Sequence, residues 1–197
     1  MSKEVIAVDV DEVLFPFAEE FIRSHNPKHG TRLELEHFTS YDFDGPLGLS
    51  VRETIERVFD FIDETERMCI IPIQDAKESV SKLSERFELV VVTARDPRFE
   101  RVTKEWLEEH FPGCFNGIEM VGYAPIMEKP VTKAEVCAKI GAIALVDDSL
   151  PHLKQIAEHG LRGVLFGNYP WNQVDYLPAG VVRKDNWPRV LEYFISS

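Results

Sequence analysis

Short apolar runs that alternate with amphipathic stretches limit, more than any other feature, what this chain can fold into. Each run ends in turn or polar residues, which is typical of parallel strands covered on both faces. Helical patterns separate most of the runs, so the sequence predicts an α/β protein with a three-layer, Rossmann-like core around a mainly parallel sheet. The runs are residues 5–8, 89–92, 118–121, 142–146 and 164–166.

Capping signals indicate where helices begin. In a capping box a hydroxyl and a carboxylate three residues apart each bond the other residue's free backbone amide. Proline after a capping residue also favours a helix start. The expected starts are Ser50 with Glu53, Asp75 with Glu78, Thr132 with Glu135, Ser149, and Asn186 with Pro188. A further amphipathic helix is expected over residues 99–111.

The stretch from residue 15 to residue 71 interrupts the alternation. Residues 13–25 are expected to be helical, residues 25–48 to form loop and turns, and apolar residues recur at helical spacing from 51 to 62. We expect residues 15–71 to form a small helical cap inserted after the first strand. Residues 1–14 and 72–197 would then form the core. The alternative is a side extension that only enlarges the core.

The charge balance excludes one class of partner. The chain of 197 residues has 34 Asp and Glu against 22 Lys and Arg, a formal net charge of −12, without a basic stripe. Nucleic acid is bound mainly through phosphate contacts to Lys and Arg, so a polynucleotide partner is not expected. A small anionic substrate can still bind where a metal ion and one or two bases reverse the local field.

Cysteine usage and hydropathy point to a cytoplasmic protein. Cys69, Cys114 and Cys137 are widely spaced, so neither a disulfide framework nor a zinc site is suggested. An odd cysteine count suits a reducing compartment. The first apolar run is too short and too acidic for a signal peptide, and no apolar stretch approaches the roughly 18 residues that suggest a membrane span.

Two pairs of aspartates follow apolar runs. Asp9 and Asp11 follow the first run, and Asp147 and Asp148 follow the fourth. Because the ends of parallel strands converge at one edge of an open sheet, the four carboxylates should lie close together, which requires a cation or protons between them. Oxygen-only ligands favour Mg²⁺. Taken alone, each pair could instead cap a turn or a helix.

Three further polar residues occupy comparable positions. Thr93 ends the second run, where its hydroxyl and the amides of Ala94 and Arg95 could hold phosphate oxygens. Lys133 lies one residue after its cap Thr132, where the helix dipole disfavours a cation, so we expect it to serve a nearby anion such as Asp9 or Asp148. Each of these residues, taken alone, could equally be an ordinary strand or surface residue. Lys129 is a weaker substitute for Lys133.

The order and placement of these residues resemble the four motifs of the haloacid dehalogenase (HAD) superfamily of phosphohydrolases. The matching positions are Asp9 to Val13, Thr93, Lys133 and Asp147 with Asp148. Val13 stands where many phosphatases of the superfamily carry Thr. The DVDEVL opening, the helical insertion, the TAR stretch and the closing KDNWPRVLEYF resemble the 5'(3')-deoxyribonucleotidase branch and its bacterial relatives.

The resemblance implies roles for the motif residues. Asp9 would be the nucleophile that forms an aspartyl-phosphate, and Asp11 would protonate the leaving oxygen and then activate water. Thr93 would hold the phosphoryl oxygens and Lys133 would steady the charge. Mg²⁺ would be held by the Asp9 side chain, the Asp11 backbone carbonyl and Asp148, with Asp147 assisting. The implied reaction is hydrolysis of a phosphate monoester, by a 5'-nucleotidase acting on (deoxy)nucleoside monophosphates.

The substrate is the less determined part of the hypothesis. Aromatic residues crowd the expected cap, and a base could stack on Phe15, Phe17 or Tyr41, although such rings more often form a small core of their own. A phosphatase for another small phosphate, such as a sugar or a cofactor precursor, is the alternative enzyme. A receiver-like signalling module that holds a phospho-aspartate is the alternative outside enzymes. The expected partner is a small phosphorylated metabolite, without a membrane, and a homodimer is left open.

Overall fold

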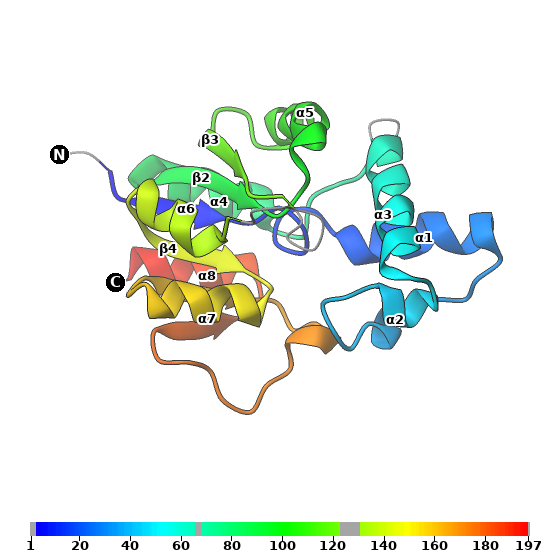
Figure 1. The fold of residues 1–197 in the computed structure, drawn as a ribbon. Coiled ribbons are helices and arrows are strands. Elements are labelled where there is room, and N and C mark those ends of the chain that lie inside the picture. The colour runs from blue at the N-terminus through cyan, green and yellow to red at the C-terminus, as the bar shows by residue number, and fades with distance from the viewer. Residues whose placement is uncertain (1–2, 66–67, 123–130, 197) are drawn as a thin grey trace.

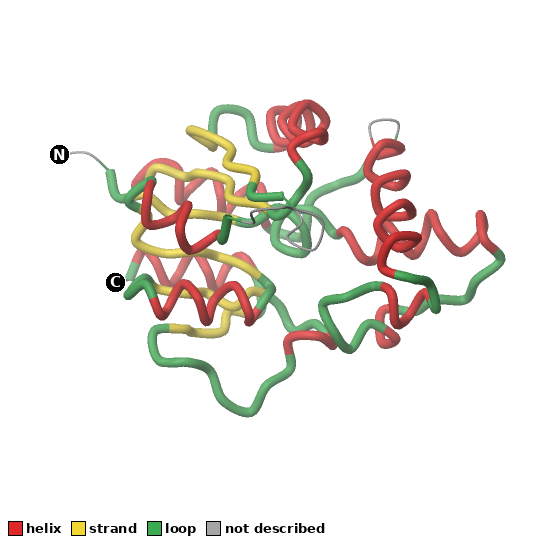
Figure 2. The backbone as a smooth tube through the Cα atoms, in the orientation of Figure 1, coloured by secondary structure: helices red, strands yellow, loops and turns green. Residues whose placement is uncertain are grey.

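The computed structural model describes residues 3–65, 68–122 and 131–196, and within them a parallel sheet forms the centre of the molecule. The strands lie in the order β3-β2-β1-β4-β5-β6, and every neighbouring pair is parallel. Figures 1 and 2 show the sheet with helices on both faces. The strands are β1 (Val5–Val8), β2 (Glu88–Thr93), β3 (Phe115–Met120), β4 (Ala142–Asp147), β5 (Arg162–Phe166) and β6 (Val181–Lys184). The predicted α/β class with a Rossmann-like, three-layer core is confirmed.

Two buried clusters cover the two faces of the sheet. Successive side chains of a strand point to opposite faces, so Ile6 and Val8 enter one cluster and Ala7 the other. The first cluster includes side chains of α4 (Ala76–Arg86), α5 (Glu100–His110) and α8 (Trp187–Ile195). The second includes side chains of α6 (Lys133–Lys139) and α7 (Leu150–Glu158). This double burial explains why the strands are nearly continuous apolar runs.

The insertion after β1 lies beyond the end of the sheet toward which the strands run (Figure 1). It consists of α1 (Phe17–His29), η1 (Leu35–His37), α2 (Asp44–Leu47) and α3 (Val51–Thr65). Phe61 of α3 packs edge-on against Phe17 and Phe21 of α1, with ring centroids 5.2 and 5.5 Å apart. These side chains belong to the same buried cluster as one face of the sheet. The position of the insertion places it over the strand ends that carry the aspartates.

Some local expectations are corrected by the structure. The first helix begins at Phe17 rather than at residue 13, because the amides of Leu14 and Phe15 both donate to the Val10 carbonyl in a tight loop. Asp75 has a left-handed backbone (φ 62°) and caps nothing with its side chain, so the proposed box there is wrong. The side chain of Ser149 also makes no cap bond, although α7 begins after it as expected.

Other boundaries follow the sequence. The boxes at Ser50 and Thr132 are both formed, and Asn186 accepts from the amide of Arg189 at the start of α8. The third strand begins at Phe115, three residues before the expected start. The sequence pattern does not predict the strand β6, because an edge strand reading VVRK is short and only one of its residues is buried. No helix in the described parts of the chain combines the length and apolar character that crossing a membrane requires.

Candidate active site

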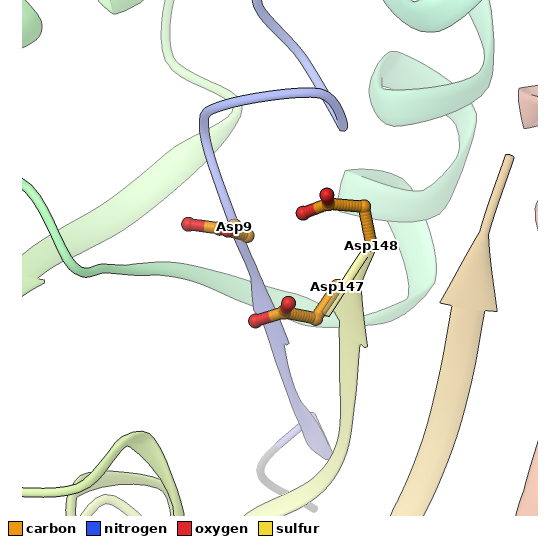
Figure 3. Close-up of side chains that lie close together, drawn as sticks. All are labelled: Asp9, Asp147 and Asp148. Carbon is orange, nitrogen blue, oxygen red and sulfur yellow. The ribbon is translucent and has the colours of Figure 1, made fainter. Parts of the chain in front are cut away.

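Asp9, Asp147 and Asp148 meet at the point in the sheet where the strand order reverses. From β1 the chain proceeds to β2 and β3 on one side, and then returns to place β4, β5 and β6 on the other. Ligands of open α/β sheets bind in the crevice at such a point, outside the carboxyl ends of the strands. Asp9 follows β1 and its amide donates to the Val146 carbonyl of β4 at 2.9 Å. Asp147 and Asp148 come at the end of that same neighbouring strand (Figure 3).

The three carboxylates form a buried group that suits a cation. One oxygen each from Asp9, Asp147 and Asp148 lies within 4.8 Å of the others, and the three residues are at most 2% exposed. Among the described residues, the Asp9 Oδ1 and Asp148 Oδ1 atoms are buried without a hydrogen-bond partner. A buried oxygen without a partner is costly unless it binds something, so these two atoms fit a hard divalent ion with oxygen ligands.

Lys133 connects two of the carboxylates. Its Nζ atom lies 2.7 Å from Asp9 Oδ2 and 2.7 Å from Asp147 Oδ2, and the side chain is 1% exposed. The Thr132 capping box begins α6 at Lys133, which aims the side chain at the strand ends. Three carboxylates against one ammonium leave a formal charge of −2 in the group when all are ionised, which matches a divalent cation.

The three carboxylates of the group differ in the direction in which their pKa values are shifted. Burial raises the pKa of Asp9 to about 6, although Lys133 opposes the shift. Burial and the charges of Asp147 and Asp9 hold the pKa of Asp148 well above its ordinary value. Burial also acts to raise the pKa of Asp147, but Lys133 and His152 outweigh it, so its pKa is lowered. Asp9 and Asp148 therefore gain most from a bound cation.

Both carboxylate oxygens of Asp147 already accept hydrogen bonds. Its Oδ1 accepts from the Ser149 amide at 2.8 Å, and its Oδ2 accepts from Lys133 at 2.7 Å. The Nδ1 atom of His152, on the first turn of α7, lies 3.3 Å from both oxygens. Burial lowers the pKa of Lys133 on its own, but Asp147 and Asp9 outweigh it and raise the pKa above its ordinary value. Asp147 thus holds Lys133 charged and in place.

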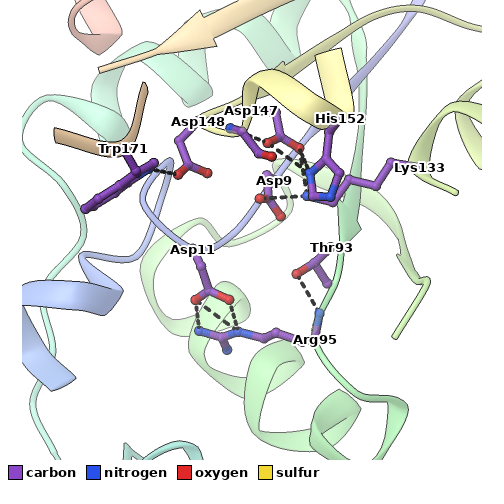
Figure 4. A network of polar contacts seen from close by, with 10 residues as sticks. Asp9, Asp11, Thr93, Arg95, Lys133, Asp147, Asp148, His152 and Trp171 are labelled. Carbon is purple, nitrogen blue, oxygen red and sulfur yellow. Dashed lines mark hydrogen bonds and ion pairs between the residues drawn. The ribbon is translucent and has the colours of Figure 1, made fainter. Parts of the chain in front are cut away.

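Asp11 lies apart from the three buried carboxylates and pairs with Arg95 (Figure 4). The Arg95 guanidinium donates to both oxygens of Asp11, and its Nη1 donates to Thr103 Oγ1 at 3.0 Å. It also lies over the Phe15 ring, 4.8 Å from the centroid. Thr93 is fully buried, and its Oγ1 accepts from the Arg95 amide at 3.3 Å. Thr93 ends β2, which is the other neighbour of β1 in the sheet, and Arg95 lies two residues beyond it.

A cavity of about 150 Å³ opens above this group, between the strand ends and the insertion. Asp11, Ala94, Arg95 and Asp148 line it from the core, and Phe17 and Tyr41 line it from the insertion. The lining is mostly apolar because α3 presents Ile55, Val58, Phe59 and Ile62. Of the residues expected to contact substrate, Phe15 does not line it: this ring is 1% exposed and packs edge-on against Trp106 at 5.0 Å.

Sequence reasoning missed three residues of the site. Glu12 and Trp171 line the cavity, and His152 contacts Asp147. Trp171 follows β5 in the stretch Asn168-Tyr-Pro-Trp-Asn172. Turn residues beside two aromatic residues after a strand are a sequence pattern that could have indicated a site residue here. Glu12 lies between two motif positions but carries a positive φ of 60°, which no sequence pattern indicated. Lys129, the weaker substitute for Lys133, lies outside the described residues.

Comparison with known proteins agrees with this geometry. Residues 3–196 match the model of the family described as 5' nucleotidase, deoxy (pyrimidine), cytosolic type C protein. The candidate nucleotidase YqfW of Bacillus subtilis is 24% identical over 192 residues, covering 95% of this chain and 92% of the relative.

Two solved structures share the fold. A haloacid dehalogenase-like hydrolase, SP0104 from Streptococcus pneumoniae, superposes with a TM-score of 0.71 at 14% identity, covering 98% of each chain. The HAD hydrolase YfnB from Bacillus subtilis, described as bound to magnesium, gives a TM-score of 0.66 at 14% identity over all of both chains. The family match spans nearly the whole chain, so this protein belongs to the cytosolic type C 5' nucleotidase family of the HAD superfamily and is a hydrolase of phosphoric monoesters.

Proposed function

We propose that this protein is a cytoplasmic, Mg²⁺-dependent phosphatase that hydrolyses (deoxy)nucleoside monophosphates through an aspartyl-phosphate on Asp9. The observation that carries the proposal is the buried group at the switch point. Asp9 contacts Lys133 through one oxygen, and among the described residues its other oxygen is buried without a hydrogen-bond partner. An oxygen of Asp9 lies within 4.8 Å of one of Asp148, which lines the apolar cavity. Phosphoryl transfer needs this combination of positioning and charge neutralisation.

The donor set supports Mg²⁺ as the ion. Its members are carboxylate oxygens, which hard cations prefer, and two of them are buried without a hydrogen-bond partner in the described parts of the chain. Mg²⁺ would be held by the side chains of Asp9 and Asp148 and by the backbone carbonyl of Asp11, with Asp147 behind them. When bound, the ion would neutralise charge on the phosphoryl oxygens. A magnesium-bound protein of the same fold is in line with this assignment.

Asp9 acts as the nucleophile in the first step. A carboxylate oxygen of Asp9 forms a bond to phosphorus while the bond from phosphorus to the ester oxygen breaks. The leaving oxygen takes a proton from Asp11, so the alcohol departs neutral. In the second step a water molecule gives a proton to Asp11 and forms a bond to phosphorus, while the bond between Asp9 and phosphorus breaks. Inorganic phosphate leaves and both side chains return to their starting states.

Thr93, Ala94 and Arg95 act on the oxygens of the transferred group. The Thr93 hydroxyl and the amides that follow it can donate to phosphoryl oxygens from the end of β2, and Arg95 supplies a positive charge at the cavity wall. Lys133 keeps one oxygen of Asp9 fixed and balances its charge. Asp11 lines the cavity and is oriented there by the guanidinium, which donates to both of its oxygens.

The insertion supports a nucleoside as the leaving group. We propose that residues 15–71 act as a cap on a core of residues 1–14 and 72–197. Phe59 of α3 contacts Phe99 of the core at 5.1 Å, and Tyr41 contacts His152 at 5.8 Å, so the cap touches the core at two points beside the cavity. Phe17 and Tyr41 line the cavity, and an apolar, ring-lined wall favours a flat base over a bare sugar.

A side-by-side substrate panel tests the proposal. Purified protein is assayed for phosphate release from pyrimidine and purine nucleoside monophosphates, hexose phosphates and p-nitrophenyl phosphate, with Mg²⁺ and with a chelator. We expect Mg²⁺-dependent turnover with the highest kcat/KM on nucleoside monophosphates. Equal activity on all esters, or a preference for sugar phosphates, would refute the nucleotidase assignment. A single stable phosphorylation per chain without turnover would instead indicate a receiver-like module.

A further inference from the structure

We infer that Trp171 is a positioning residue for Asp148, and that the segment after β5 is an additional part of the cation site. The inference rests on the proposed Mg²⁺ site. The indole Nε1 of Trp171 donates to Asp148 Oδ2 at 2.7 Å (Figure 4). The other oxygen, Oδ1, is buried and has no partner among the described residues. The indole thus holds one oxygen of the carboxylate and leaves the other directed at the group formed with Asp9 and Asp147.

Tyr169 fixes the plane of this indole. The rings of Tyr169 and Trp171 are stacked, with centroids 4.7 Å apart and planes 3° from parallel. The Tyr169 hydroxyl donates to the Glu12 carbonyl at 2.7 Å, which ties the segment to the loop that carries Asp9 and Asp11. Gly167 makes room for the ring: a Cβ at this position would lie 2.3 Å from Tyr169 Cε2. The stacked ring pair is therefore fixed by the hydrogen bond from Tyr169 to the Glu12 carbonyl and by the space that Gly167 leaves for the Tyr169 ring.

Asn172 fixes the backbone of the same aspartate. Its Nδ2 donates to the Asp148 carbonyl at 3.2 Å and to the Phe166 carbonyl at 3.0 Å. Its Oδ1 accepts from Arg183 Nη1 at 2.9 Å, which anchors the amide on β6, and the residue is fully buried. Both the side chain and the main chain of Asp148 are thus held by η4 (Pro170–Asn172) and its neighbours.

These contacts have the form expected of a second layer around a metal ligand. A ligating carboxylate that is already hydrogen bonded binds its ion without having to be ordered first, and loss of such a partner typically costs about 10- to 100-fold in metal affinity. Trp171 also lines the cavity, so a change there can alter substrate binding as well. The test therefore has to measure the ion without substrate.

Mg²⁺ binding by isothermal titration calorimetry on the full chain provides that measurement. Trp171→Phe keeps an aromatic ring but removes the donor. Trp106→Phe is the matched control, because it removes an indole N–H that donates to a backbone carbonyl, that of Ile70, at 2.9 Å. Asp148→Asn removes a proposed carboxylate ligand and is the reference for loss of Mg²⁺ binding. We expect the Mg²⁺ Kd to rise about 10- to 100-fold in Trp171→Phe and to stay at the wild-type value in Trp106→Phe.

The activity of Trp171→Phe gives a second readout. The Mg²⁺ concentration for half-maximal activity should rise by the same factor, and saturating Mg²⁺ should restore kcat, which a general loss of structure would not allow. Gly167→Ala, which displaces the Tyr169 ring while leaving Trp171 in the chain, should weaken Mg²⁺ binding in the same direction. This variant tests the inference if Trp171→Phe does not fold.

The outcomes separate this inference from the proposed function. A Trp171→Phe protein that binds Mg²⁺ as tightly as the wild type would overturn the positioning role alone. A wild-type protein that shows no Mg²⁺ binding sensitive to Asp148→Asn would overturn the proposed cation site, and the role of Trp171 with it. Equal weakening in Trp171→Phe and Trp106→Phe would show a general structural effect and would also overturn the inference.

Discussion

The guanidinium of Arg95 binds both carboxylate oxygens of Asp11. Its Nη2 donates to Oδ1 at 2.6 Å and its Nε donates to Oδ2 at 3.0 Å. The two residues lie 84 positions apart in the chain, and Arg95 is itself held by Thr103 and by the Phe15 ring. A two-point arrangement of this kind fixes the orientation of the carboxylate as well as its charge. Asp11 is thus held beside the buried carboxylates but not among them.

Replacing Arg95 by Lys should impair catalysis although the charge is kept. An ammonium is a point donor and cannot hold two oxygens in the plane of a fork or lie flat on Phe15. We expect kcat/KM on a nucleoside monophosphate to fall by about 10- to 100-fold, a loss of roughly 1.4 to 2.7 kcal/mol. Steady-state kinetics measure the change, with Arg86→Lys at the exposed end of α4 as the control. Unchanged kcat/KM would show that the fork is dispensable.

Replacing Asp9 by Asn should abolish turnover while the protein stays folded. The amide keeps the shape of the side chain but is a poor nucleophile, and loss of a catalytic nucleophile costs about 10⁴-fold or more in kcat. Phosphate release and circular dichroism, measured on the same preparation, check both parts. Asp75→Asn, an exposed aspartate before α4, is the matched control. Substantial activity in Asp9→Asn would exclude Asp9 as the nucleophile.

Replacing Lys133 by Met should destabilise the protein, most strongly without Mg²⁺. The change leaves Asp9 and Asp147 buried without the ammonium that both contact at 2.7 Å, and breaking a buried ion pair costs about 3 to 5 kcal/mol. Urea unfolding in chelator and in Mg²⁺ measures the effect. Added Mg²⁺ should reduce the difference from the wild type, because a cation then offsets the same carboxylates.

The control for Lys133 is Lys139→Met, at the exposed end of the same helix. It should unfold at nearly the wild-type urea concentration, because surface charges contribute little to stability. A Lys133→Met protein as stable as this control in chelator would contradict the proposed charge balance in the buried group.

The stability of the metal-free protein should fall as the pH rises, in part because of Glu12. Burial raises the pKa of Glu12 to about 8 from an ordinary value of 4.5. Between these values the folded protein binds more protons at this site than the unfolded chain does. The contribution of Glu12 is therefore complete below about pH 4.5 and is lost as the pH rises through about 8, with a slope of at most about 1.4 kcal/mol per pH unit.

Glu12→Gln should remove this part of the pH dependence. The amide keeps an oxygen that can accept from the Ala18 amide, as Glu12 does, and it never ionises. Free energies of unfolding in chelator at pH 5, 6, 7 and 8 should show the variant gaining on the wild type as the pH rises. The same change at the exposed Glu158 is the control. A constant difference between Glu12→Gln and the wild type would contradict the raised pKa.

The core of this fold was predictable because its signals are local. Apolar runs buried on both faces, helix caps such as Thr132 with Glu135, and polar residues directly after the runs are all readable from a few adjacent positions. Because parallel strands end at one edge of the sheet, the sequence alone also predicts that Asp9 and Asp148 lie close together. The edge strand β6 is not predicted in this way because only Val181 in it is buried.

What the tertiary structure alone decided is which side chain contacts which. The sequence determined that acids, a lysine and a threonine would share a crevice, since that follows from strand order and chain direction. It could not show that Arg95 binds Asp11, that Phe15 is buried while Phe17 lines the cavity, or that Trp171 holds Asp148. Those contacts join segments far apart in the chain, and they depend on rotamers, the positive φ of Glu12 and the room left by Gly167, which only packing in three dimensions sets.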